Sequence, residues 1–144
     1  MKIMLDSNAF DKMQNLDDLE KIVACDKYEY FITSIQIEEI GNIPDEKKEA
    51  RIRNLLTLCK IRAKLLFVPA VLDHARVGLC SLVDKHDIYS DLLNPSRNNI
   101  HDAMIGSAAK RENCIVVTND VDFIKKLHKH SIQTMRYEEF IDSL

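Results

Sequence analysis

The chain has 144 residues and a formal net charge of −3, with 46% hydrophobic and 30% charged residues. This length and composition predict a single globular domain, residues 1–144, and exclude intrinsic disorder. No apolar stretch approaches the roughly 20 residues that cross a bilayer, and the N-terminus lacks the features of a secretory signal, so we expect a cytoplasmic protein with no membrane partner. The slight acidity argues against a protein that coats DNA through an excess of Lys and Arg.

In the first half of the chain, short apolar runs alternate with amphipathic segments. Strands are predicted over 2–5 and 30–33, and helices over 17–25, 34–41 and 44–62. Ser34 is a good N-cap for the second of these helices, and Gly41 ends it. The predicted apolar stripe of the third helix consists of Ile52, Leu55, Leu56 and Cys59.

The second half of the chain continues the alternation. Its predicted elements are a strand over 65–68, a helix over 72–85, a polar loop over 87–99, a helix over 99–112, a strand over 114–117, a helix over 121–129, a weak strand over 132–134 and a helix over 137–143. Strands that alternate with helices predict an α/β fold with a mostly parallel sheet and helices on both faces. Function in such sheets gathers at the carboxyl ends of the strands.

Acidic residues follow two of the predicted strands and lie within two of the predicted helices. Asp6 ends the first strand, Asp120 follows the fourth, Glu39 lies in the helix after the second, and Asp102 lies in the first turn of the helix before the fourth. Each acid alone has an ordinary explanation, such as a helix cap. Together, two carboxylates about 4 Å apart would repel by roughly 4 kcal/mol at an effective dielectric constant of ~20. A hard cation, Mg²⁺ or Mn²⁺, would offset this repulsion, and such ions suit phosphodiester chemistry.

Four segments together resemble the PIN-domain ribonucleases, and they occur in the expected order along essentially the whole chain. The segments are Asp6-Ser7-Asn8, Ser34-Ile35-Gln36-Ile37-Glu38-Glu39-Ile40, His101-Asp102-Ala103-Met104-Ile105-Gly106-Ser107-Ala108-Ala109 and Val117-Thr118-Asn119-Asp120-Val121-Asp122-Phe123. The resemblance implies a five-stranded parallel sheet in the order 3-2-1-4-5. It also implies a metal-dependent endoribonuclease, as in the VapC-like toxins of toxin–antitoxin modules, with an antitoxin protein and a second copy of the chain as candidate partners.

The resemblance also implies a role for each acid. It assigns four catalytic acids, Asp6, Glu39, Asp102 and Asp120, an accessory metal acid, Asp122, and two orienting polar residues, Asn8 and Thr118. Asp6, Asp102 and Asp120 would hold the metal directly, and Glu39 would complete the shell or help to remove a proton from the attacking water. The adjacent Glu38 leaves a one-residue ambiguity, and Glu39 is preferred because it immediately precedes Ile40.

A basic segment could hold the RNA. Residues 46–64 contain seven basic residues and two acids, and Arg53, Lys60 and Lys64 fall on one helical face if the helix continues that far. An ordinary solvated helix face explains the same pattern equally well.

Two other functions remain open on the sequence. A haloacid-dehalogenase-like phosphatase would use Asp6, Thr33 or Ser34, and Asp120 with Asp122, but would leave Glu39 and Asp102 without a role. The other alternative is a catalytically silent PIN-like module that binds RNA or protein.

Overall fold

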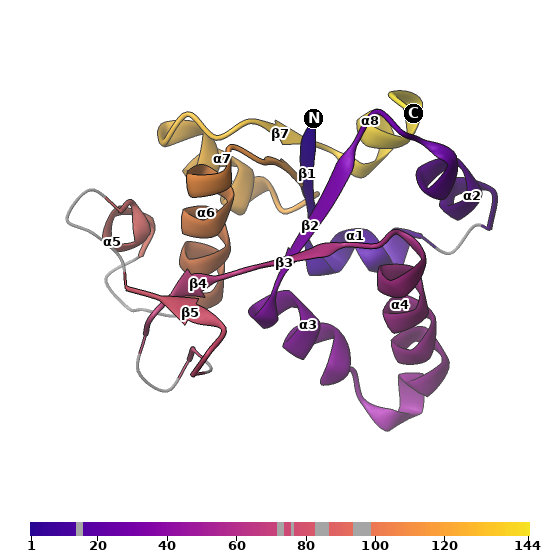
Figure 1. Cartoon of the computed structure of the whole chain (residues 1–144), viewed down its shortest axis with the longest axis horizontal. Coiled ribbons are helices and arrows are strands. Elements are labelled where there is room, and N and C mark those ends of the chain that lie inside the picture. The colour runs from indigo at the N-terminus through magenta and orange to yellow at the C-terminus, as the bar shows by residue number, and fades with distance from the viewer. Residues whose placement is uncertain (14–15, 72–73, 76, 83–86, 94–98) are drawn as a thin grey trace.

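The computed structural model describes residues 1–13, 16–71, 74–75, 77–82, 87–93 and 99–144 (Figure 1). Its strands are β1 (Lys2–Leu5), β2 (Glu29–Thr33), β3 (Lys64–Leu66), β4 (Val68–Pro69), β5 (Cys80–Ser81), β6 (Ile115–Val117) and β7 (Thr134–Met135). Its helices are α1 (Ser7–Lys12), α2 (Leu16–Ala24), α3 (Ser34–Gly41), a 3-10 helix (Asp45–Lys47), α4 (Lys48–Lys60), α5 (Tyr89–Leu92), α6 (Ile100–Glu112), α7 (Val121–Lys129) and α8 (Tyr137–Asp142). None of these helices is long and apolar enough to span a membrane.

Five parallel strands form the main sheet, in the order β3-β2-β1-β6-β7. This confirms the predicted α/β fold and the order 3-2-1-4-5, because β6 and β7 are the fourth and fifth strands of that prediction. Leu5 pairs with Val117, and the Asp6 N–H donates to the Val117 carbonyl at 3.0 Å. The carboxyl ends of β1 and β6 therefore lie side by side.

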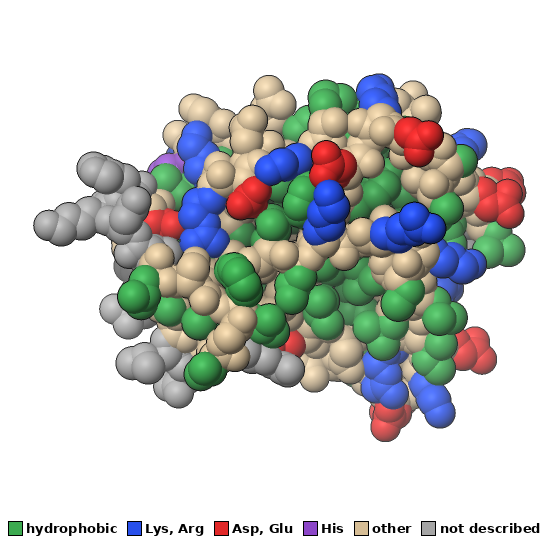
Figure 2. Space-filling view, in the orientation of Figure 1, with side chains coloured by type: hydrophobic (Ala, Val, Ile, Leu, Met, Phe, Trp, Pro, Cys, Tyr) green, Lys and Arg blue, Asp and Glu red, His purple; other side chains and the backbone are tan. Residues whose placement is uncertain are grey.

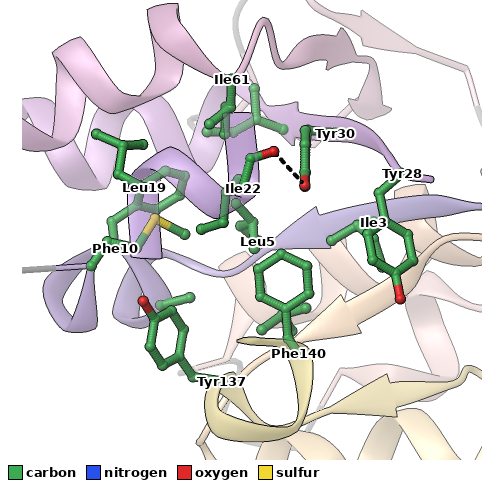
Figure 3. Packing of buried hydrophobic residues seen from close by; sticks show 14 of the residues in the cluster. Ile3, Leu5, Phe10, Leu19, Ile22, Tyr28, Tyr30, Ile61, Tyr137 and Phe140 are labelled. Carbon is green, nitrogen blue, oxygen red and sulfur yellow. Dashed lines mark hydrogen bonds between the residues drawn. The ribbon is translucent and has the colours of Figure 1, made fainter. Parts of the chain in front are cut away.

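Side chains that alternate along the strands build two cores, one on each face of the sheet. On one face Ile3 and Leu5 pack with residues of α1, α2 and α8, including Phe10, Ile22 and Phe140 (Figure 3). On the other face Met4 packs with buried residues of α6 and α7. Helices cover both faces, so the sheet edge formed by the strand ends is left for polar side chains.

Three elements differ from the sequence predictions. Residues 7–12 form α1, which is not among the predicted elements, and the Asp6 side chain caps this helix. In the predicted helix over 72–85, the described residues include a turn at Gly78, whose φ of +87° is incompatible with a helix, and the strand β5. The rest of that prediction lies outside the described residues. The loop predicted over 87–99 contains the short helix α5. At its start the Tyr89 N–H donates a hydrogen bond to Asp87 Oδ1 at 2.8 Å.

Smaller corrections concern helix starts, strand bounds and the face that α4 buries. Thr33 rather than Ser34 caps α3, and the predicted third strand is divided between β3 and β4, which belong to different sheets. The predicted apolar stripe of α4 is exposed: Ile52, Leu55 and Leu56 keep 46%, 37% and 56% of their surface. Hydrophobic side chains are accordingly visible on the surface over α4 (Figure 2). Asn54 and Thr57 are the buried residues of this helix.

Candidate carboxylate site

Asp6 is the buried centre of the site. It follows the central strand β1 and is 7% exposed. Its Oδ1 accepts the Ser7 N–H at 2.8 Å, while its Oδ2 accepts hydrogen bonds from Asn8 Nδ2 at 2.6 Å and Thr118 Oγ1 at 2.7 Å. Burial raises the pKa of Asp6, the hydrogen bonds from Thr118 and Ser7 oppose the rise, and the charges of Glu39 and Asp102 add to it. The hydrogen bonds to Asp6 therefore offset only part of the effect of its burial and of the neighbouring acids.

The two predicted orienting residues both lie against Asp6. Thr118 is fully buried at the end of β6, and its Oγ1 accepts hydrogen bonds from Asn8 Nδ2 at 3.1 Å and from the Asp120 N–H at 3.2 Å. The Asn119 N–H donates to Asn8 Oδ1 at 3.4 Å. These bonds connect the loop after β6 to the start of α1, and thus fix Asp6 relative to Asp120.

The acids after β6 have different surroundings. Asp120 caps α7, where its Oδ1 accepts the N–H groups of Asp122 and Phe123 at 2.8 and 2.9 Å. Asp122 is 82% exposed and pairs with Lys125 at 3.0 Å, a hydrogen bond that lowers the pKa of Asp122. The structure thus places Asp120 beside the hydrogen bonds of Asp6, and Asp122 on the solvent side of α7.

Asp102 and Glu39 complete the group from two other helices. Asp102, in the first turn of α6, lies 3.6 Å from Lys126 Nζ, and Glu39 lies 3.0 Å from His101 Nδ1. Burial raises the pKa of Asp102, Lys126 opposes the rise, and the charges of Asp120 and Glu39 increase it. The four predicted acids therefore interact electrostatically across four elements of the fold.

The geometry favours Glu39 over its neighbour Glu38. The charge of Glu39 raises the pKa of both Asp6 and Asp102. Glu38 instead lines a shallow hollow between α3 and α4, together with Ile37 and Leu55. Among the described residues, neither Asp6 nor its hydrogen-bonding partners Ser7, Asn8 and Thr118 line this hollow.

The donor set fits a hard divalent cation in its chemistry, because the four interacting side chains supply only carboxylate oxygens. The burial of Asp6, which its hydrogen bonds compensate only in part, is a second reason to expect a cation there. Within the described residues, no three His, Cys, Asp or Glu side chains are near enough to one another to hold an ion. Metal binding would thus require the carboxylates to approach, and two of them, Asp102 and Glu39, would leave their present partners Lys126 and His101.

The predicted RNA-binding residues are not all near these acids. Lys64 pairs with Glu29 at 2.7 Å. Both residues begin their strands, β3 and β2, so this pair lies at the end of the sheet opposite the carboxylates. Arg53 and Lys60 line an apolar hollow beside α2 with Leu16. The structure therefore does not bring Lys64 to the carboxylates.

Two residues near the site were missed by sequence reasoning. Gln36 is fully buried, forms a capping box with Thr33, and donates from Nε2 to the Leu5 carbonyl at 2.8 Å. It thereby holds α3 against the end of β1. The spacing Thr33-x-x-Gln36 is a capping-box pattern and could have revealed it. Lys126 carries no such signal, because its approach to Asp102 depends on how α6 and α7 pack.

Two substitutions of Asp120 test whether its side chain stabilises the fold as the cap of α7, independently of its charge. Asp120→Ala removes the acceptor of two N–H groups, so we expect the free energy of unfolding without metal to fall by about 0.5–2 kcal/mol. Asp120→Asn keeps a capping oxygen and should lose much less. Urea denaturation of both variants measures the difference, and equal losses would contradict the capping role.

Comparisons with known proteins agree with this geometry. The family model described as PIN domain matches residues 3–128. A search of curated proteins gives no match. The fold is similar to VapBC-1 from nontypeable Haemophilus influenzae (15% identity, TM-score 0.51, covering 96% of this chain and 99% of that one). It is also similar to VapBC2 from Rickettsia felis bound to a DNA fragment from their promoter (17% identity, TM-score 0.55, covering 94% of this chain and 98% of that one). A third similar structure is a domain of a functionally unknown protein from Methanocaldococcus jannaschii (16% identity, TM-score 0.55, covering 94% of this chain and 89% of that one). The family match spans most of the chain and contains all four acids, and the chain therefore belongs to the PIN-domain family.

Proposed function

We propose that this protein is a Mg²⁺- or Mn²⁺-dependent endoribonuclease that hydrolyses RNA phosphodiester bonds in the cytoplasm. The observation that carries the proposal is the buried Asp6, which is hydrogen-bonded to the end of β6 and lies in the field of Glu39 and Asp102. PIN domains are generally nucleases, which supports a hydrolase.

The side chains of the chain itself have separate tasks in this proposal. Asp6, Asp102 and Asp120 would hold the cation, and Asp122 is an accessory acid that would have to turn from Lys125 to contribute. Asn8 and Thr118 orient Asp6 through hydrogen bonds to its Oδ2. Glu39 would complete the shell of ligands or accept a proton from the attacking water. When bound, the cation would activate water and stabilise charge on the phosphodiester.

The proposal extends to the partners of the protein. We infer that it acts as the toxin of a toxin–antitoxin pair, with a cognate antitoxin protein, and that it forms a homodimer. The fold similarity to the VapBC-1 and VapBC2 structures supports this extension. A neighbouring gene for a small DNA-binding antitoxin would strengthen it, and the absence of such a gene would weaken the toxin assignment while leaving the nuclease.

The test is incubation of single-stranded and structured RNAs with the purified protein and Mn²⁺, Mg²⁺ or EDTA. We expect cleavage only with a divalent cation, giving 5′-phosphate and 3′-hydroxyl ends. A phosphate monoester is included as a second substrate. Release of inorganic phosphate from it without RNA cleavage would instead identify a phosphatase, and metal binding without turnover of either substrate would identify a silent module.

A further inference from the structure

Lys126 is the one Lys or Arg, within the part of the chain that the structure describes, that forms an ion pair with any of the four acids. Its Nζ lies 3.6 Å from Asp102 Oδ2, and the side chains of Lys126 and Asp102 are 31% and 39% exposed. The next residue, Leu127, is fully buried in the core under α7. Lys126 is thus held at the border between the buried face of α7 and the carboxylates.

The position of this ammonium has a direct electrostatic consequence. Asp120 sits at the N-terminus of α7 and Lys126 lies six residues further, so one helix presents both an acid and a cation to the site. The Lys126 charge partly offsets the raising of the Asp102 pKa by Asp120 and Glu39. A divalent cation on Asp102 would meet the repulsion of this ammonium at close range.

We propose that Lys126 is a resident counter-cation of Asp102, which pairs with this carboxylate in the metal-free protein and must be displaced when a divalent metal binds. Lys126 is therefore a positioning residue that weakens metal affinity and stabilises the empty site. The inference rests on the proposed function, because it needs Asp102 to be a metal ligand.

The test is titration of the metal-free, full-length protein with Mn²⁺ by isothermal calorimetry. We expect Lys126→Gln and Lys126→Met to lower the Kd for Mn²⁺ by about threefold to fivefold, the range for a partly exposed ion pair. The Met variant keeps the apolar stem of the side chain, so it covers the case in which the Gln variant folds poorly. Lys126→Arg keeps the cation and should retain the wild-type Kd.

Lys129→Gln is the matched control, since it removes the same charge from the exposed end of α7. It should leave the Kd unchanged. The Mn²⁺ concentration for half-maximal RNA cleavage should fall in the Lys126→Gln protein by the same factor as the Kd.

Asp102→Asn distinguishes the two ways in which the inference can fail. If this variant binds Mn²⁺ weakly while Lys126→Gln binds like the wild type, the counter-cation role is overturned and the metal site stands. If Asp102→Asn binds Mn²⁺ as well as the wild type, Asp102 is not a ligand, and both the metal-site assignment and the counter-cation role are overturned. If Lys126→Gln and Lys129→Gln lower the Kd for Mn²⁺ equally, the effect comes from the net charge of the protein, and the counter-cation role of Lys126 is overturned.

Discussion

The Asp6→Asn variant is expected to lose RNA cleavage by more than about 100-fold at saturating Mn²⁺. Changes in residues that only support metal ligands typically cost about 10–100-fold, so loss of a direct ligand charge should exceed that range. Asparagine keeps the shape of the side chain and an oxygen for the Ser7 N–H, so the start of α1 should persist. Initial rates on one RNA substrate measure the effect.

Asp45→Asn provides the control for this comparison. It removes the same charge at an 87% exposed side chain in the 3-10 helix, where Asp45 pairs with Arg51. Its cleavage rate should stay within about twofold of the wild type, as expected for a surface change away from the site. Cleavage that survives Asp6→Asn would remove Asp6 from the catalytic assignment.

The largest expected effect on stability comes from Phe140→Ala in α8. Phe140 is fully buried, and its ring centroid lies 5.9 Å from that of Tyr28 and 6.3 Å from that of Tyr30, so it fills the centre of one core (Figure 3). Truncation of such a side chain leaves a cavity and should lower the free energy of unfolding by about 3–5 kcal/mol.

Chemical denaturation of the Phe140→Ala protein tests this expectation, with Val121→Ala as the comparison. Val121 is 51% exposed, so its truncation should change the free energy of unfolding by under about 0.5 kcal/mol. Similar losses in the two variants would show that α8 contributes little to the core.

The sheet was predictable from sequence because its strands carry local signals. The bounds Lys2–Leu5 were predicted without error, and the order of the five strands followed once the family resemblance was recognised. Within the helix predicted over 72–85, the described residues 77–82 are not helical, and the prediction failed there because the spacing of the apolar residues resembles a helical face. Val77 and Leu82 are 100% and 92% exposed, whereas Ala75 and Cys80 pack against the core, so the apolar residues do not share one buried face. Apolar spacing cannot show whether a face is buried, and α4 illustrates the same limit at Leu56.

The acids of the candidate site were named from their positions after strands and at helix starts, but their partners were not. Asp102 and Lys126 are 24 residues apart and meet only because α6 and α7 pack on the same face of the sheet. The hydrogen bonds of Thr118 to Asp6 span 112 residues of sequence. Contacts at such separation depend on tertiary packing, which leaves no local pattern in the chain.

The position of β1 between β2 and β6 has a consequence for synthesis of the protein on the ribosome. β1 emerges before the other strands of its sheet, yet one of its two neighbours, β6, follows more than a hundred residues later. Until β6 and the start of α7 have emerged, Asp6 lacks Thr118 and the acids cannot meet. A nascent chain that has not yet exposed β6 and the start of α7 therefore has no assembled site. Formation of this long-range pairing also adds loop-closure cost, which slows folding of parallel sheets.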